Sequence, residues 1–306
     1  PVILMTGEPG LESAVHAVEY GAFRYLAKPV ERQKLWETVS RAARLHGMAK
    51  LKRQALELPG SDGQRLGERA ALEIRFSWGV ELMWMAFQPI VRWGEQGLFG
   101  YEALLRSNEP SLPHPGAVLE AAERLEKLHD LGRKVRESAA ESFARAPAGA
   151  SLFVNLHTED LLDPTLYEAE SPLSRIADRV VLEVTERATI DRVNDINARM
   201  SILRYLGYRI AVDDLGAGYA GLTSFAALEP EIVKLDMSLV RGIHKSTVRQ
   251  RIVGSMVSLC KELKILVVAE GVETMDERDS ILSLGCDILQ GYFFARPGPP
   301  FPELKR

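Results

Sequence analysis

The chain is constrained most by a repeated alternation of short apolar segments with amphipathic helical patterns, from about residue 70 onward. Eight apolar segments predict strands, at residues 85–91, 99–105, 152–156, 180–184, 210–212, 232–235, 265–269 and 287–293. Helical patterns lie between most of them, for example at residues 193–206 and 250–263. Most consecutive strands begin about 20 to 35 residues apart, which is the size of a strand–helix unit. Eight such units in about 235 residues predict a closed (β/α)₈ TIM-like barrel.

The alternative fold for this alternation is an open, doubly wound sheet. It is less favoured because no glycine-rich dinucleotide-binding turn follows the first strand. A net charge of −4 gives no global electrostatic case for binding DNA. No apolar run approaches the roughly 18 residues of a membrane span. The two cysteines, Cys260 and Cys286, fall in apolar patterns, so we expect both to be buried and reduced, as suits a cytoplasmic enzyme.

The N-terminal segment, residues 1–57, has a different organisation. Its pattern predicts a strand at 2–5, a helix at 11–20, a strand at 23–27 and a helix at 31–53. This partial β-α-β-α segment resembles the C-terminal half of a response-regulator receiver domain, through Thr6, Gly21-Ala22 and Lys28-Pro29. The resemblance implies a histidine kinase upstream of the intact parent protein. The phosphate-accepting aspartate of that family lies in the half that this chain lacks, so we expect no receiver-type phosphorylation.

The boundary between the two parts is predicted at a cluster of helix breakers, Leu58-Pro-Gly-Ser-Asp-Gly63. We assign residues 58–69 to a linker and residues 70–306 to the barrel domain. The basic residues between 41 and 53 are typical of a solvated helix face, which is favoured over a nucleic-acid contact.

Polar residues stand at the end of nearly every predicted strand. They are Glu102 and Arg106 on the second strand, Asn155 on the third, Glu183 and Glu186 on the fourth, Asp213-Asp214 on the fifth, Lys234 and Asp236 on the sixth, Glu270 and Glu273 on the seventh, and Gln290 on the eighth. Because side chains two apart share one face of a strand, many of these residues follow apolar positions that would fill the barrel interior. We therefore expect them at the C-terminal mouth, where barrel enzymes hold their active sites.

The predicted mouth carries more carboxylates than cations, with Arg106 and Lys234 as the only opposing charges counted there. Converging carboxylates repel one another, and divalent cations relieve this most naturally. Oxygen ligands from Asp, Glu and Asn suit Mg²⁺ or Mn²⁺. The histidines are scattered without zinc spacing. For the pair Asp213-Asp214, capping of the following helix is the alternative.

This set of motifs resembles the EAL domain of cyclic di-GMP phosphodiesterases over about residues 70–300. The signatures are Glu102-Ala-Leu-Leu-Arg106, Phe87-Gln-Pro-Ile90, Val154-Asn155, Leu182-Glu-Val-Thr-Glu186, Asp213-Asp214, Lys234-Leu-Asp236, Glu270-Gly-Val-Glu273 and Gln290-Gly-Tyr-Phe-Phe. The resemblance implies metal-dependent hydrolysis of cyclic di-GMP to 5′-pGpG, with two Mg²⁺ or Mn²⁺ ions per site. It also implies a homodimer formed through this domain.

The resemblance assigns a role to each residue. The implied metal ligands are Glu102, Asn155, Glu183, Asp213 and Asp214, with Asp236 supporting the second ion. Glu270 is the candidate general base, and Lys234 positions the attacking water or stabilises charge at the phosphate. The implied substrate contacts are Gln88, Leu104, Arg106 and Gln290. Glu186 and Glu273 are the implied positioning residues of the loop after Asp214.

Several alternatives stay open at this point. Arg106 could pair with a nearby acid, Lys234 and Asp236 could form a salt bridge without chemistry, and Glu186 or Glu273 could cap a helix or face solvent. The turn Gly216-Ala-Gly-Tyr-Ala-Gly221 lacks hydroxyls that are common in the family, so we expect a looser loop. The competing function is a receptor that binds cyclic di-GMP without cleaving it. Because no ligand or base of the family pattern is missing, the sequence favours the enzyme.

Overall fold

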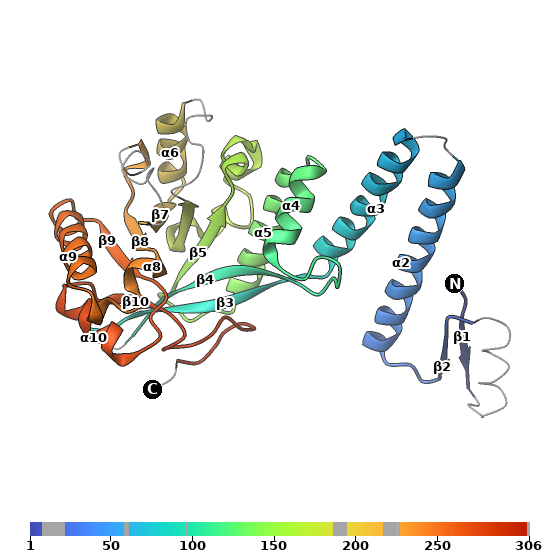
Figure 1. Cartoon of the computed structure of the whole chain (residues 1–306), viewed down its shortest axis with the longest axis horizontal. Coiled ribbons are helices and arrows are strands. Elements are labelled where there is room, and N and C mark those ends of the chain that lie inside the picture. The colour runs from blue at the N-terminus through green and yellow to red at the C-terminus, as the bar shows by residue number, and fades with distance from the viewer. Residues whose placement is uncertain are drawn as a thin grey trace. The chain divides into compact units, whose positions relative to one another are not determined.

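The computed structural model describes residues 1–7, 22–57, 61–95, 97–185, 195–216, 225 and 227–304 (Figure 1). The chain divides into two compact units. The first comprises Pro1–Glu81 with Glu109–Leu112, and the second comprises Leu82–Asn108 with Pro113–Arg306.

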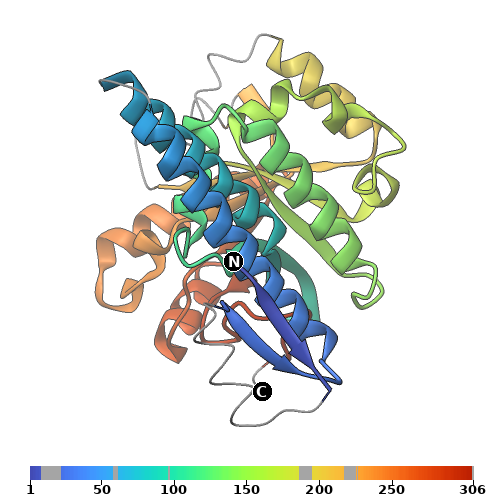
Figure 2. The ribbon, with the colours of Figure 1, turned by 90° about the vertical axis from the view of Figure 1, so that its right-hand side faces the viewer.

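The first unit combines a small parallel sheet with two long helices. Strand β1 (Ile3–Thr6) pairs in parallel with β2 (Arg24–Ala27), and the chain continues into α2 (Arg32–Glu57) and α3 (Ser61–Glu81). The two helices lie side by side (Figures 1 and 2). They approach closely at Gly47, where an added Cβ would stand 3.2 Å from Cδ1 of Ile74.

The junction differs from the linker that we expected at residues 58–69, because residues 61–69 form the first part of α3. Residues 64–72 are mostly Gln, Arg, Leu, Glu and Ala, which are strong helix formers, so the breakers interrupt only the junction itself. The compact barrel unit accordingly begins at Leu82 rather than at residue 70. The helix expected at 11–20 lies outside the described residues, and the receiver-like relationship stays a prediction.

The second unit is a closed eight-stranded barrel, which confirms the predicted fold class. Its strands are β3 (Met83–Arg92), β4 (Gly97–Ser107), β5 (Ser151–Leu156), β6 (Val180–Thr185), β7 (Arg209–Leu215), β8 (Ile232–Leu235), β9 (Leu266–Ala269) and β10 (Ile288–Gln290). Their order around the barrel is β10-β3-β4-β5-β6-β7-β8-β9. Every one of them overlaps a segment that the apolar pattern predicted.

One strand departs from the uniform direction of a (β/α)₈ barrel. Strand β3 pairs antiparallel with both β4 and β10, whereas the other neighbouring strands pair in parallel. Only residues 93–96 separate β3 from β4, which suffices for a hairpin and is too short for a crossover helix. As a result, the end of β3 at Arg92 lies at the same barrel end as the beginnings of the parallel strands.

Helices follow most of the parallel strands and surround the barrel (Figure 1). The α-helices of this unit are α4 (Pro115–Arg124), α5 (Leu128–Phe143), α6 (Ile196–Tyr205), α8 (Met237–Val240), α9 (Thr247–Glu262) and α10 (Met275–Ser283). Short 3₁₀ helices are η1 (Thr158–Leu162), η2 (Pro164–Tyr167), η3 (Ser174–Arg179) and η5 (Ile243–Lys245). Among the described helices of the whole chain, none has the length and apolar character needed to cross a membrane.

A layer of buried apolar side chains closes the middle of the barrel. It consists of Ile90, Phe153, Val181, Ala211, Ile232, Val268 and Ile288. These residues face inward on seven different strands and are all 1% exposed or less. Because side chains alternate along a strand, the positions two residues away on either side also face the interior. The apolar layer therefore separates two polar ends of the barrel.

Candidate active site

The C-terminal end of the barrel interior is a polar layer built directly above the apolar one. On β5 to β10 the polar residues stand two positions after an apolar-layer residue; they are Asn155, Glu183, Asp213, Lys234, Glu270 and Gln290. On β3, which runs in the opposite direction, Gln88 stands two positions before Ile90 and opposite Glu102 of β4. The structure thus brings these side chains together from eight strands, although the sequence separates them by up to about 200 residues.

Lys234 lies at the centre of this layer and is fully buried. Its Nζ atom lies 2.6 Å from Glu183 Oε1 and 2.6 Å from Glu270 Oε1. The same atom lies 3.2 Å from Asp213 Oδ1 and 3.4 Å from Glu102 Oε2. A buried ammonium would be costly alone, and here four carboxylates compensate it. The expected alternative, a simple pair between Lys234 and Asp236, is not what the structure shows.

Amide side chains hold Glu102 in place from both sides. Asn155 Nδ2 donates to Glu102 Oε1 at 2.8 Å, and Gln290 Nε2 donates to Glu102 Oε2 at 2.7 Å. Gln290 Nε2 also lies 3.2 Å from Gln88 Oε1, while Gln88 Nε2 donates to the carbonyl of Ala295 at 3.2 Å. These bonds fix the orientation of the amides. Because Asn155 donates through nitrogen, its carbonyl oxygen is left as an oxygen ligand.

The crowding of charge shifts the pKa values of these groups in opposite directions. Burial raises the pKa of Glu183 well above its ordinary value, with Lys234 opposing and Glu102 adding to the rise. Burial also raises the pKa of Glu270, to about 8, against the opposing effect of Lys234. For Glu102 burial acts upward, yet Lys234 and the amide donors outweigh it and lower the pKa.

Burial would lower the pKa of Lys234, but its four carboxylate neighbours raise that pKa well above the ordinary value. The lysine is therefore cationic throughout the neutral range, and without a further cation some of the carboxylates around it retain protons.

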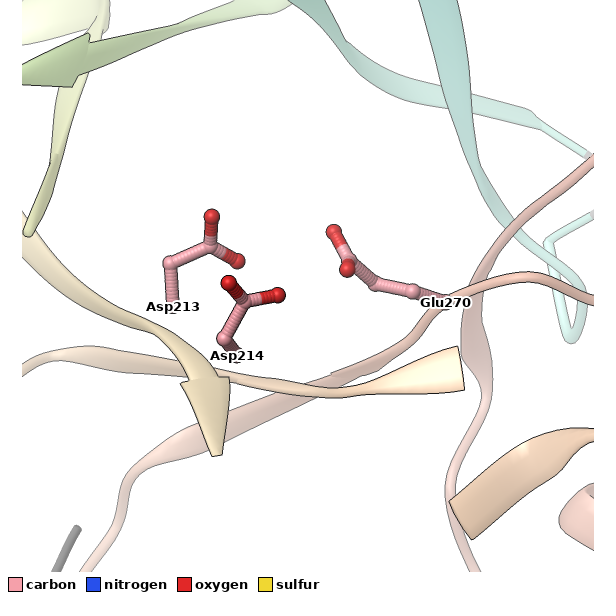
Figure 3. A group of neighbouring side chains, drawn as sticks. All are labelled: Asp213, Asp214 and Glu270. Atoms are coloured by element: carbon pink, nitrogen blue, oxygen red, sulfur yellow. The ribbon is translucent and has the colours of Figure 1, made fainter. Parts of the chain in front are cut away.

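Asp213 and Asp214 both reach the mouth, although neighbouring residues on a regular strand point to opposite faces. The pairing of β7 with β8 is irregular between Val212 and Leu215, and Asp214 has a left-handed backbone with φ of 59°. Figure 3 shows the two aspartates on β7 directed toward Glu270 from the facing side. Oxygens of these three carboxylates all lie within 4.8 Å of one another. The local distortion of β7 is what assembles this triad.

The donor set fits a divalent cation. Three carboxylates within 4.8 Å offer oxygen ligands, which hard ions such as Mg²⁺ and Mn²⁺ prefer. Beside them, Glu183 Oε2 is buried and has no hydrogen-bond partner among the described residues. A buried carboxylate oxygen without a donor is costly, and a cation would satisfy it. The cluster can therefore bind metal.

A cavity of about 320 Å³ opens above the triad. Of the residues singled out from sequence, it is lined by Gln88, Glu102, Leu104, Asp213, Asp214, Asp236, Glu270, Glu273 and Gln290. Asn155, Glu183 and Lys234 contribute from beside or beneath this lining through their contacts with Glu102 and Glu270. Arg106 is not part of the lining, and its Nη1 donates to the carbonyl of Leu105 at 2.8 Å.

The two acids at the rim have structural contacts as well. Asp236 Oδ1 accepts the backbone N–H of Ser238 at 2.9 Å and so caps helix α8. Glu273 is exposed and pairs with Arg241 at 2.5 Å. Glu186 and the turn at residues 217–221 lie outside the described residues. The assigned roles of these residues therefore stay predictions.

Five further lining residues had no role assigned from the sequence: Met237, Arg241, Gly271, Gly291 and Tyr292. The last three stand within quoted motifs, Glu270-Gly-Val-Glu273 and Gln290-Gly-Tyr-Phe-Phe. A signal for Arg241 was available, because it follows Met237 by four residues and thus shares a face of the helical turn after β8. The two glycines allow close approach of neighbouring segments at the cavity lining. An added Cβ at Gly291 would lie 2.1 Å from the carbonyl oxygen of Val272, and one at Gly271 would lie 2.4 Å from Cβ of Met237.

Comparison with known proteins places this geometry in a family. The EAL domain family matches residues 80–297. The signaling protein YkoW of Bacillus subtilis is 30% identical over 224 residues, covering 70% of this chain and 28% of YkoW. The cyclic di-GMP phosphodiesterase RocR of Pseudomonas aeruginosa is 31% identical over 222 residues, covering 70% of this chain and 57% of RocR.

Among solved structures, a standalone EAL protein from Vibrio cholerae O395 in its c-di-GMP-bound form is 31% identical with a TM-score of 0.61. The match covers 73% of this chain and 95% of that chain. The chain spans only about a quarter to a half of the lengths of YkoW and RocR. The matched region nevertheless contains the whole barrel and both aspartates of the triad, and the chain belongs to the EAL domain family.

Proposed function

We propose that the chain hydrolyses one phosphodiester bond of cyclic di-GMP, giving linear 5′-pGpG. The observation that carries this proposal is the carboxylate triad of Asp213, Asp214 and Glu270 at the barrel mouth (Figure 3). It lies beside a fully buried lysine and beneath a 320 Å³ cavity. The relative RocR is a cyclic di-GMP phosphodiesterase, and the Vibrio protein is seen with c-di-GMP bound.

Two divalent cations, Mg²⁺ or Mn²⁺, complete the proposed site. Glu102, Asn155, Glu183 and Asp213 would hold one ion, and Asp214 with support from Asp236 would hold the other. When bound, the pair lowers the pKa of water and stabilises charge on the attacking and leaving oxygens. The cations also neutralise the acidic mouth, which would otherwise repel a dianionic nucleotide.

The side chains of the chain perform the remaining tasks. Glu270, as a carboxylate, accepts the proton of the attacking water at Oε. Lys234 Nζ lies 2.6 Å from that carboxylate group, so the ammonium fixes its orientation and stabilises charge at the reacting phosphate. Gln88, Leu104 and Gln290 offer substrate contacts within the cavity.

The arginines are the proposed phosphate contacts. Arg241 lines the cavity with a side chain that is 51% exposed and pairs with Glu273, so its guanidinium can turn to a phosphate oxygen of the substrate. Arg106 stays a predicted phosphate contact from the family pattern. Glu186 and Glu273 stay the predicted positioning residues of the loop after Asp214.

Product analysis tests the proposal. We expect cyclic di-GMP incubated with the chain and Mn²⁺ to give pGpG, resolved by chromatography against synthetic standards. Binding of cyclic di-GMP measured by calorimetry without any pGpG would instead support the receptor function. Absence of both binding and product would overturn both.

The remaining proposals concern the setting of the protein. A homodimer through the EAL domain, an upstream histidine kinase for the parent protein and a cytoplasmic location stay predictions. Size-exclusion chromatography with light scattering tests the first, with a mass of about 68 kDa expected for two chains of 34.0 kDa.

A further inference from the structure

A second cavity, of about 520 Å³, lies at the opposite end of the barrel. Its lining comes from the end of β3, the starts of β4, β5 and β7, and the residues just before β6: Arg92, Glu95, Leu98, Phe99, Gly149, Ala150, Ser151, Asp178, Arg179 and Arg209. A volume of this size is typical of small-ligand sites. None of these residues takes part in the acidic site.

Three arginines from three different elements converge on this cavity. Arg209 is the first residue of β7, and its Nη2 donates to Ser151 Oγ at 2.7 Å. Arg179, the last residue of η3, donates to the carbonyls of Ala150 and Pro147. These bonds hold both guanidinium groups against the rim of the cavity, and each group keeps further N–H donors for a ligand.

Arg92 adds an unsatisfied donor. Its Nε atom is buried and has no hydrogen-bond partner among the described residues. Its Nη1 lies 3.3 Å from Glu95 Oε1, but the Glu95 side chain is 72% exposed, so this pair is weak. The guanidinium lies 4.9 Å from the centre of the Phe99 ring, which supports it from one side.

The charge of the cavity is incompletely balanced. Against three arginines the lining offers two acids, Glu95 and Asp178. Within the described part of the chain, neither Arg179 nor Arg209 has a carboxylate at ion-pair distance. Burial lowers the pKa of the Arg209 guanidinium, and the carboxylates of Glu231 and Asp178 oppose this effect without outweighing it. An anionic ligand would offset that desolvation.

The apolar layer isolates this end of the barrel from the acidic mouth. Arg92 stands two residues after Ile90, and Arg209 stands two residues before Ala211. Both arginines therefore lie directly next to the apolar layer, on the side away from the acidic mouth. A ligand here would meet neither Lys234 nor the carboxylate triad. The barrel interior is thus acidic at one end, apolar in the middle and cationic at the other.

We propose that the cavity at the N-terminal end of the barrel binds a small anion with two or more phosphate groups. Guanidinium groups bind phosphate through paired N–H donors, and three of them on separate elements suit more than one phosphate group. The hydroxyl of Ser151 supplies a further polar contact. The proposal does not depend on the phosphodiesterase activity.

Calorimetric titration with pyrophosphate tests this site. The chain is first freed of metal by chelation and desalted. Pyrophosphate then cannot bind at the acidic mouth through a bound cation. At constant ionic strength we expect saturable binding with one site per chain, weakened about tenfold or more by Arg209→Gln. The control is Arg175→Gln, which removes an exposed arginine of η3, the 3₁₀ helix that also carries Arg179, and should leave the affinity unchanged.

Two further variants keep the test decisive. Arg92→Gln should also weaken binding about tenfold while leaving the bond between Arg209 and Ser151 in place, which covers the case that Arg209→Gln fails to fold. Arg241→Gln, at the acidic mouth, should leave the affinity for pyrophosphate unchanged in the chelated protein. The proposal is overturned if pyrophosphate does not bind, if Arg92→Gln and a folded Arg209→Gln bind as tightly as the parent, or if only Arg241→Gln loses binding.

Citrate and ADP identify the chemistry of the ligand. Citrate carries several carboxylates and no phosphate, so the proposal predicts weaker binding than pyrophosphate. Tighter binding of citrate would contradict the preference for phosphate. If ADP binds more tightly than pyrophosphate and loses affinity equally in Arg209→Gln, the ligand is a nucleotide. If ADP and pyrophosphate bind with equal affinity, the site recognises the phosphates alone.

Discussion

At the scale of single residues, the site depends on one lysine that is 0% exposed among four carboxylates. Because the carboxylates raise its pKa, Lys234 stays charged and fixes the positions of Glu183 and Glu270 at 2.6 Å each. The sequence indicated that these residues meet, since each stands two positions after an apolar-layer residue. It could not indicate which carboxylates the lysine contacts, because that depends on the curvature of the closed barrel.

Replacing the candidate base separates chemistry from binding. Glu270→Gln keeps the size of the side chain and removes its ability to accept a proton. We expect kcat for cyclic di-GMP hydrolysis to fall roughly 10²- to 10⁴-fold, with nucleotide affinity changed much less. Turnover is measured as pGpG formed, and affinity by calorimetry. Glu262→Gln, at an exposed position of α9, is the control, and turnover of Glu270→Gln at the parent rate would exclude Glu270 as the base.

Cation affinity should depend on pH through the same glutamate. Without a cation, burial raises the pKa of Glu270 to about 8, so the group is largely protonated at neutral pH. A cation held by the neighbouring Asp213 and Asp214 favours the charged carboxylate of Glu270 over the neutral carboxyl, so proton and cation compete. We therefore expect Mg²⁺ affinity to rise as pH increases from 6 to 8, with proton release on binding.

Titration calorimetry in two buffers of different ionisation enthalpy measures both the affinity and the protons released. In Glu270→Gln the pH dependence should become shallower. An affinity that does not change between pH 6 and 8 in the parent protein would contradict the assigned protonation.

At the scale of elements, the strands were predictable because their apolar segments are short and repeat regularly. The antiparallel direction of β3 follows only from its short connection to β4. Residues 93–96 are enough for a hairpin and too few for a crossover helix. The helix at Ser61–Glu81 was missed because Pro59, Gly60 and Gly63 obscured the helix formers that follow them. The distortion at Asp214 was also unpredictable, since φ of 59° is a tertiary outcome for a non-glycine residue.

The loop after β5 is anchored by a buried ion-pair network. Arg136 of α5 donates to Asp160 Oδ1 and Asp163 Oδ2, both at 2.6 Å, and Arg133 adds a bidentate contact to Asp163. Burial acts to raise the pKa of Asp163, but the bonds from Arg133, Thr165 and Arg136 outweigh it and lower that pKa. The network fixes the chain directly after Asn155.

Breaking this network should destabilise the barrel strongly. Arg136→Met leaves Asp160 and Asp163 buried without their shared cation, which we expect to lower the free energy of unfolding by about 3 to 5 kcal/mol. Urea denaturation followed by tryptophan fluorescence measures the change. Arg175→Gln breaks an exposed pair with Glu170 and should cost less than about 1 kcal/mol. Equal losses in the two variants would show that the network adds no more than a surface pair.

At the scale of the whole molecule, the barrel interior presents two unlike polar ends around one apolar layer. The acidic end was predictable, because strand-end carboxylates and an amide stand out against apolar segments. The cationic end was not, because Arg92, Arg179 and Arg209 belong to a strand end, a 3₁₀ helix and a strand start with no common spacing. Only the antiparallel direction of β3 brings Arg92 to the same end as the others.

The proposed reaction is hydrolysis of cyclic di-GMP at the acidic end of the barrel, with divalent cations bound there. The most direct measurement is the initial rate of pGpG formation by the chelated chain as Mn²⁺ is added back. We expect no product without added cation, a rate that rises with Mn²⁺ and saturates, and loss of that activation in Asp214→Asn. A rate independent of Mn²⁺, or no pGpG at any Mn²⁺ concentration, would contradict it.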